Sequence, residues 1–251
     1  MLRLFRAITN PNSFWREVVR CGFLERHNHP ESWLSFRHSV GRECAMRKRS
    51  GEWVPSKSLD EILGPTRSAT GKIVYDAQTP YNLSWAELVI LSQIVASLRP
   101  LQLFEIGTFN GRTTLHLALN APDNALVTTV DLGSGEFNFG ADKRYFASTH
   151  VGSCFQNTEV AKKIVQVLGD SHSLDFSACA RSMDLVFIDG DHSYAGVMKD
   201  SELAFSLIRP GGVILWHDYL MIGDVTRAIS SLKKIHSLYR IADTSLVICM
   251  T

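Results

Sequence analysis

Several protein classes leave signatures that this 251-residue sequence lacks. Its five cysteines are scattered, odd in number and without C-x-x-C spacing. This distribution argues against a disulfide framework or a cysteine zinc site and favours reduced thiols in a cytoplasmic protein. No apolar run approaches the length of a membrane span, and residues 1–10 lack the continuous apolar core of a signal peptide. We therefore expect neither a disulfide scaffold nor a membrane protein.

An excess of one charge sign is also missing from the chain as a whole. The net charge is +1 at pH 7, with 45% hydrophobic and 20% charged residues. This balance argues against nucleic acid as a partner and against an acidic disordered chain. Residues 1–50 are locally basic, with ten Lys and Arg against four Asp and Glu. We interpret this end as a solvated helical face, with a patch for an anionic partner or membrane surface as the alternative.

The apolar pattern divides the chain in two. Residues 1–70 show helical spacing without strand-like alternation, so we predict a helical N-terminal extension there and one main domain over residues 71–251. In the main domain, short apolar runs alternate with helical patterns, and Ser84 with Glu87 forms a capping box. The last two apolar runs form a closing antiparallel pair. These features predict an α/β fold with a doubly wound sheet.

Residues 184–219 hold the densest group of side chains suited to chemistry. Apolar runs at 185–188 and 213–216 flank a stretch with the length and apolar spacing of one helix, which predicts two parallel strands. Ligands of open α/β sheets bind beyond the carboxyl ends of such strands. The acidic and histidine residues that we expect at this edge are Asp189, Asp191, His192, His217 and Asp218.

A glycine-containing turn at 105–111 follows the first strand of the main domain. Gly107 permits a sharp turn and close approach of a ligand to the backbone, and Gly111 permits close packing of the next helix. The turn lacks the G-x-G-x-x-G fingerprint, which disfavours a nicotinamide oxidoreductase. A purely structural turn is the alternative.

The next two strands also end in polar residues. Asp131 occupies the position where doubly wound sheets place an acid on a ribose. Asp170 and Ser171 follow the third strand and suit the edge of an adenine ring. Ordinary turn and capping roles are the alternative for both aspartates. Polar residues at the ends of three adjacent strands favour a nucleoside site.

Together, the E-x-G-x-x-x-G turn, the acid after the second strand, the GDS sequence and the I-D-G-x-H sequence resemble class I S-adenosylmethionine-dependent methyltransferases. The resemblance runs from about Lys72 to Thr251 and is nearest to small-molecule, metal-dependent O-methyltransferases of the catechol and sugar type. It implies a Rossmann-like seven-stranded sheet with an antiparallel last strand, and S-adenosylmethionine as cofactor. The residues implied to bind it are Glu105, Gly107, Thr108 and Gly111 near the methionine part, Asp131 at the ribose, and Asp170 and Ser171 at the adenine.

The same resemblance suggests roles at the edge of the sheet. Metal-dependent relatives carry an aspartate after the fourth strand, matched by Asp189, and an acidic pair after the fifth, matched by His217 and Asp218. Carboxylates suit Mg²⁺, whereas the imidazole shifts preference toward Mn²⁺, Fe²⁺ or Zn²⁺. His192 matches a histidine general base of some sugar O-methyltransferases, and an imidazole titrates near neutral pH. Helix capping by His192 and a carbonyl hydrogen bond from His217 are the alternatives, and a site without metal remains open.

Three neighbouring features complete the expectation. Asp191 should cap the following helix, and Tyr219 lines the acceptor pocket or covers the strand end. Residues 133–140 are expected to form a lid, with a plain insertion as the alternative. The predicted function is O-methylation of a small hydroxylated metabolite or sugar, without a nucleic-acid or membrane partner; a homo-oligomer is compatible with the sequence. A non-catalytic nucleoside-binding module and another transferase on the same scaffold are the alternatives.

Overall fold

The computed structural model describes residues 53–64, 69–74, 82–133 and 151–251. The chain divides into two compact units, Met1–Trp53 and Val54–Thr251, and the second holds nearly all described residues. All of the predicted lid except Gly133 and most of the predicted N-terminal extension lie outside the described residues, and the domain boundary at residue 70 stays a prediction. No helix in the described part of the chain is long and apolar enough to cross a membrane.

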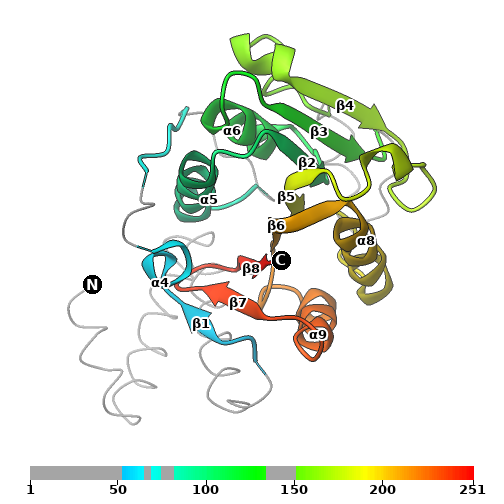
Figure 1. The fold of residues 1–251 in the computed structure, drawn as a ribbon. Coiled ribbons are helices and arrows are strands. Elements are labelled where there is room, and N and C mark those ends of the chain that lie inside the picture. The colour runs from blue at the N-terminus through cyan, green and yellow to red at the C-terminus, as the bar shows by residue number, and fades with distance from the viewer. Residues whose placement is uncertain (1–52, 65–68, 75–81, 134–150) are drawn as a thin grey trace, which may run out of the picture. The chain divides into compact units, whose positions relative to one another are not determined.

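A mixed sheet forms the centre of the second unit (Figure 1). Among the described residues it has eight strands in the order β1-β7-β8-β6-β5-β2-β3-β4. The strands are β1 (Ser56–Lys57), β2 (Gln102–Ile106), β3 (Leu126–Asp131), β4 (Ile164–Leu168), β5 (Met183–Ile188), β6 (Ile208–Trp216), β7 (Leu238–Ile241) and β8 (Val247–Met250). Strands β2 to β6 pair in parallel, whereas β8 runs antiparallel to β6 and β7. The predicted doubly wound sheet with an antiparallel last strand is confirmed.

One short strand was not predicted. Ser56 and Lys57 pair in parallel with Arg240 and Ile241 of β7 and add an eighth strand at the edge of the sheet. Two residues are too few to show the alternation by which a strand is recognised in sequence. The chain then enters α4 (Leu59–Leu63), the short helix that the sequence predicted before Gly64.

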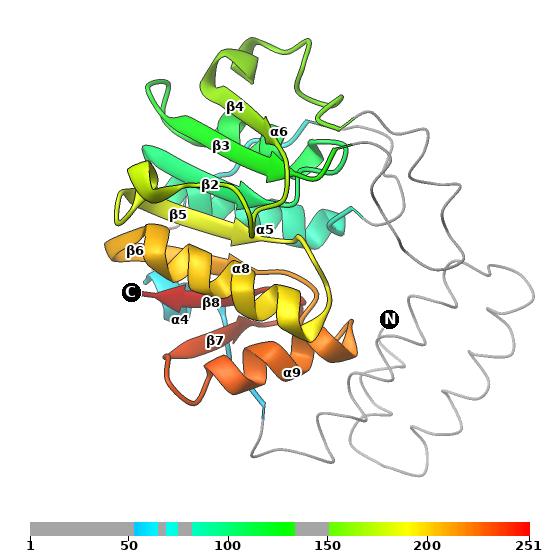
Figure 2. The ribbon, with the colours of Figure 1, turned by 90° about the vertical axis from the view of Figure 1, so that its right-hand side faces the viewer.

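Helices cover both faces of the sheet, as Figure 2 shows. Helices α5 (Trp85–Leu98) and α6 (Arg112–Asn120) lie on one face, and α8 (Tyr194–Leu207) and α9 (Gly223–Leu232) lie on the other. The helix expected from Thr158 is only a 3-10 turn, η3 (Glu159–Lys163), because β4 begins at the next residue. A second 3-10 turn, η4 (Ser177–Cys179), precedes β5. These four α-helices thus lie against the faces of the sheet and not across the carboxyl ends of its parallel strands (Figures 1 and 2).

A serine side chain caps the N-terminus of each of the two 14-residue helices α5 and α8. At α5 the capping box is confirmed, because Ser84 accepts a hydrogen bond from the amide of Glu87 and the carboxylate of Glu87 accepts one from the amide of Ser84. At α8 the N-cap is Ser193, whose Oγ accepts from the amide of Gly196. The predicted cap by Asp191 is wrong. Its carboxylate instead accepts hydrogen bonds from the amide and hydroxyl of Ser193, which holds the cap in place.

Candidate active site

The candidate site lies where the strand order reverses, because β2 is flanked by β3 on one side and by β5 on the other. Gly107 follows β2 with a φ of +98°, and a Cβ there would lie 2.0 Å from the carbonyl oxygen of Asp189. The amide of Asp189 also donates to the carbonyl of Ile106 at 2.8 Å. Since only glycine fits between these two strand ends, the turn after β2 touches the tip of β5 directly. Ligands of doubly wound sheets bind at such a switch point.

Asp131, at the end of β3, organises the turn after β2. Its Oδ2 accepts hydrogen bonds from the amides of Thr108 and Phe109, each at 2.8 Å. Burial raises the pKa of Asp131, although the backbone hydrogen bonds favour its ionised form. Gly111 ends the turn as the N-cap of α6 with a φ of +82°. Gly107, Thr108 and Gly111, which are predicted to bind the cofactor, thus lie in one loop that Asp131 holds from β3.

Glu105 lies fully buried inside β2, next to this turn. Its Oε2 accepts hydrogen bonds from the hydroxyls of Thr114 and Thr129. Its Oε1 is buried and accepts no hydrogen bond from the described residues. Burial raises the pKa of Glu105 to about 8. An oxygen in this state is a candidate acceptor for a polar group of a ligand.

The tip after β4 is joined to α8 through an aspartate that the sequence analysis missed. Asp200 is buried in α8, and its Oδ1 accepts a hydrogen bond from the hydroxyl of Ser171 at 2.9 Å and lies 2.9 Å from Nε2 of His172. Asp170 is exposed and accepts a hydrogen bond from the amide of His172. Burial raises the pKa of Asp200. No local pattern could have found this partner, since it sits in mid-helix, 29 positions from Ser171.

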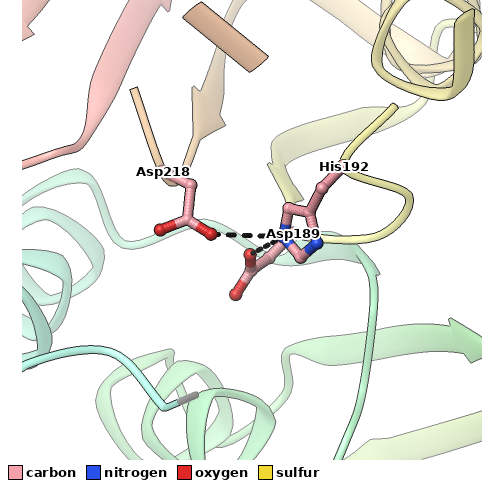
Figure 3. A group of neighbouring side chains, drawn as sticks. All are labelled: Asp189, His192 and Asp218. Atoms are coloured by element: carbon pink, nitrogen blue, oxygen red, sulfur yellow. Dashed lines mark hydrogen bonds and ion pairs between the residues drawn. The ribbon is translucent and has the colours of Figure 1, made fainter. Parts of the chain in front are cut away.

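Four predicted residues converge beyond the ends of β5 and β6, and Figure 3 shows three of them. Oδ1 of Asp189 lies 3.4 Å from Nε2 of His192 and 3.2 Å from Nδ1 of His217. The Asp218 carboxylate reaches the same two rings, at 3.2 Å from Nε2 of His192 and 3.4 Å from Nδ1 of His217. Two carboxylates and two imidazoles therefore share one small volume.

Opposite charges dominate the electrostatics of this group. Burial disfavours the charged form of Asp189, but the charges and hydrogen bonds of the two imidazoles outweigh it and hold its pKa below the ordinary range. Burial likewise opposes protonation of His192, and hydrogen bonds to Asp189 and Asp218 nevertheless raise its pKa to about 10. For His217 the charges of the same carboxylates overcome burial and raise the pKa well above 6.5. The two carboxylates thus favour the protonated form of both rings.

The donor set fits a divalent cation. Ligand atoms of Asp189, His192 and Asp218 all lie within 4.8 Å of one another. Two carboxylates with an imidazole suit Mg²⁺, Mn²⁺, Fe²⁺ or Zn²⁺. The predicted metal set used His217 in place of His192, and Nδ1 of His217 faces the same two carboxylates. Asp218 has a φ of +61°, a conformation that non-glycine residues adopt chiefly where the surroundings impose it, often at functional sites.

Glu87 extends the group behind His217. Its Oε2 lies 3.5 Å from Nε2 of His217, on the side of the ring opposite to Asp189. Burial opposes ionisation of Glu87, but the hydrogen bond and charge of His217 outweigh burial and lower the pKa of this carboxyl. The sequence identified Glu87 only as a helix-capping residue. Its second contact joins residues far apart in the chain and has no local signal.

The structure also settles the position of Tyr219. Its side chain is fully buried, and its hydroxyl accepts a hydrogen bond from the amide of Val54 at 2.9 Å. Tyr219 therefore covers the strand end and ties β6 to the segment before β1. A direct role in binding an acceptor is not supported by this geometry.

Comparisons with known sequences cover the same part of the chain. Residues 104–219 match a family model described as a methyltransferase domain. A caffeoyl-CoA O-methyltransferase of Stellaria longipes is 27% identical over 141 residues, which cover 54% of this chain and 53% of the relative. Another, of Populus kitakamiensis, is 24% identical over 169 residues, which cover 67% and 68%. The chain thus spans about half the length of the first of these relatives.

Solved structures give a weaker likeness. The O-methyltransferase TomG from Streptomyces achromogenes, in complex with SAM, has a TM-score of 0.49 and 19% identity and covers 68% of this chain and 82% of that chain. Because this score is below 0.5, the fold assignment rests on the strand order of the chain itself and on the sequence matches. By that strand order, the methyltransferase domain matched over residues 104–219 and the sequence relatives, the chain is similar to class I S-adenosylmethionine-dependent methyltransferases of the caffeoyl-CoA O-methyltransferase-like type.

Proposed function

We propose that this protein transfers a methyl group from S-adenosylmethionine to a hydroxyl of a small molecule, with the help of a divalent cation and a histidine. One observation carries the proposal. The cluster of Asp189, His192 and Asp218 stands beside the Gly107 turn, at the switch point of the sheet. A donor held on the turn would present its methyl group toward the cluster, so that donor and acceptor meet in one place.

The cofactor would lie along the tips of β2, β3 and β4. Its methionine part would contact the turn formed by Gly107, Thr108 and Gly111, close to Oε1 of Glu105, which accepts no hydrogen bond from the described residues. Its ribose hydroxyls would approach the carboxylate of Asp131. The adenine would lie near Asp170 and Ser171, where Ser171 is held by Asp200. Each of these assignments follows the resemblance and is supported by the position of the residue at the carboxyl edge.

The cation would be held by Asp189, Asp218 and one of the two imidazoles, with His217 as our choice. Bound there, it would act as a Lewis acid that lowers the pKa of the acceptor hydroxyl. His192 then takes the hydroxyl proton on a ring nitrogen. The oxygen forms a bond to the methyl carbon as the sulfur–carbon bond breaks, leaving S-adenosylhomocysteine and the methyl ether. His192 can serve as base only when neutral, which requires that Asp189 and Asp218 no longer hold its proton.

The names of the sequence relatives guide the choice of candidate acceptors. The names of the two plant relatives specify caffeoyl-CoA, so hydroxylated aromatic thioesters belong in a substrate panel together with catechols and hydroxylated sugars. A small-molecule acceptor is the common element of these names. A homo-oligomer remains compatible with this proposal and is not required by it.

The test combines binding with turnover. Calorimetry should detect binding of S-adenosylhomocysteine, and transfer of labelled methyl groups to at least one panel member should need Mg²⁺ or Mn²⁺ and stop with a chelator. Asp189→Asn and Asp218→Asn should abolish binding of the metal together with turnover. Glu202→Gln, which changes an exposed carboxylate on α8, is the matched control and should behave as wild type. No cofactor binding in the wild-type protein would overturn the proposal.

A further inference from the structure

Glu87 connects three separate segments through one buried carboxylate. Its Oε2 accepts hydrogen bonds from the amide and hydroxyl of Ser84, at 3.1 and 2.7 Å, at the start of α5. Its Oε1 accepts from the amide and hydroxyl of Ser245, at 2.8 and 2.6 Å, just before β8. The third contact is Nε2 of His217 at the tip of β6, 3.5 Å from Oε2. Both oxygens of Glu87 are thus engaged.

Helix capping alone does not account for this burial. The chain contains a second capping box at α4, where the carboxylate of Glu61 accepts hydrogen bonds from the amide and hydroxyl of Ser58. Glu61 is exposed, whereas Glu87 is 7% exposed. Removing a carboxylate from water costs several kcal/mol unless it is paired with a charge and hydrogen-bonded. The feature that distinguishes Glu87 from Glu61 is its position between Ser245 and His217.

The ring of His217 is held from two sides as a result. Its Nε2 faces Glu87, and its Nδ1 faces Asp189 at 3.2 Å and Asp218 at 3.4 Å. An imidazole that donates one N–H to a carboxylate has a fixed ring plane, and its other nitrogen points in a defined direction. Here that direction is the cluster beyond β5 and β6.

We propose that Glu87 is a positioning residue, which orients His217 so that Nδ1 faces the carboxylates of Asp189 and Asp218. The role of that orientation in turnover rests on the proposed function, but the orientation itself does not. The start of α5 and the turn before β8 are thereby tied to the site, because the carboxylate that holds His217 is itself held by Ser84 and Ser245. Loosening either segment should disturb the ring.

The orientation of the His217 ring can be measured directly by nuclear magnetic resonance. The Nε2–H proton of His217, assigned by its absence in His217→Asn, should give a protected, hydrogen-bonded signal in ¹H–¹⁵N spectra of the wild-type protein. Glu87→Ala should remove that signal and weaken Mn²⁺ binding, measured by electron paramagnetic resonance, by about 10–100-fold. Glu61→Ala, the matched capping-box control, should change neither readout.

A second variant covers the case in which Glu87→Ala does not fold. Glu87→Gln keeps an acceptor oxygen for Ser84 and lacks the charge that faces His217, so the Nε2–H signal should exchange faster and Mn²⁺ should bind more weakly than in wild type. An unchanged His217 signal and unchanged Mn²⁺ affinity in folded Glu87 variants would overturn the proposal. The spectra need neither cofactor nor acceptor, so a wild-type protein without methyl transfer would refute the proposed function and leave this inference standing.

Discussion

Nδ1 of His217 lies 3.2 Å from Oδ1 of Asp189 because the strands that carry them are paired in register. Ile188 at the end of β5 pairs with Trp216 at the end of β6, so the next residue of each strand emerges beside the other. The amide of His217 also donates to the carbonyl of Ile188 at 3.1 Å. A shift of one residue would turn one of the two side chains to the opposite face. Strand register thus brings the members of the cluster together.

The first prediction tests the role of His192 as the base. His192→Gln removes the proposed base and keeps a polar side chain of similar length, so kcat should fall by about 100–10,000-fold. The Kd for S-adenosylhomocysteine should stay near the wild-type value, because the residues assigned to the cofactor at the ends of β2, β3 and β4 are unchanged. Rapid-quench assays of methyl transfer measure kcat, and calorimetry measures the Kd.

The control for this variant is His236→Gln. His236 stacks on Phe205 of α8, with ring centroids 3.9 Å apart, and belongs to neither the cluster nor the cofactor tips. Its replacement should lower stability slightly and leave kcat unchanged. If His192→Gln turns over as fast as His236→Gln, His192 is not the base.

Much of the fold could be predicted because its signals are local. The apolar runs, the capping box at Ser84 and the glycine turn at Gly107 each lie within a few residues, so periodicity and turn chemistry identify them. The same rules place the ends of parallel strands at one edge, which was enough to bring Asp189 and His217 together. What sequence reasoning found was therefore the set of residues at the carboxyl edge.

The contacts behind that edge could not be predicted in this way. Glu87 and His217, or Ser171 and Asp200, meet only after the chain has folded. The sequence alone explains Glu87 as a capping residue and Asp200 as a mid-helix residue, so neither signals its distant partner. Local competition also explains the error at Asp191. The serine two positions later was better placed to accept the amide of Gly196, so Asp191 supports the cap instead of forming it.

The second prediction concerns the contact between the turn and β5. In Gly107→Ala, the new Cβ would overlap the carbonyl oxygen of Asp189, in addition to the strain of a positive φ. Strain alone costs about 1–3 kcal/mol, and the backbone must also shift, so we expect the free energy of unfolding to fall by more than that and cofactor binding to be lost. Urea unfolding and calorimetry measure both effects.

Gly64→Ala provides the matched comparison. Gly64 has a φ of +78° and open space around its missing Cβ, so this variant carries the strain without the collision. It should lose about 1–3 kcal/mol and bind the cofactor normally. Equal losses of stability in the two alanine variants would show that the close approach of Asp189 is unimportant.

The third prediction is a pH dependence of stability caused by Glu105. Its pKa is raised from 4.5 to about 8 in the folded protein, so folding takes up a proton between these values. The contribution of Glu105 to stability is complete below pH 4.5 and is lost as the pH rises through about 8. Glu105→Gln should remove this pH-dependent contribution to stability. The amide of the glutamine can still accept hydrogen bonds from Thr114 and Thr129, but it does not titrate.

The measurement is the free energy of unfolding in urea as a function of pH. Between pH 4.5 and about 8, the free energy of unfolding of the wild-type protein should fall relative to that of Glu105→Gln by up to about 1.4 kcal/mol per pH unit. Contributions of other titrating groups are common to both proteins and largely cancel in the difference. Parallel curves for the two proteins would mean that Glu105 is ionised in the folded state at neutral pH.

The last prediction distinguishes two roles of Asp131. Its Oδ2 holds the amides of Thr108 and Phe109, and the proposed function assigns the carboxylate to the ribose as well. Asp131→Asn should weaken binding of S-adenosylhomocysteine by about 10–100-fold, as expected for the loss of hydrogen bonds to a charged group. Asp123→Asn, which alters an exposed carboxylate in the loop before β3, should bind normally.

A cofactor analogue without the ribose 2′-hydroxyl decides which role applies. If the Asp131 carboxylate binds that hydroxyl, removing either partner abolishes the same interaction, and the two losses should not add in a double-mutant cycle. If Asp131 only shapes the turn, the analogue and the Asp131→Asn variant should each lose affinity independently, with additive free energies. Additivity would therefore return Asp131 to the structural role that aspartates commonly have in turns.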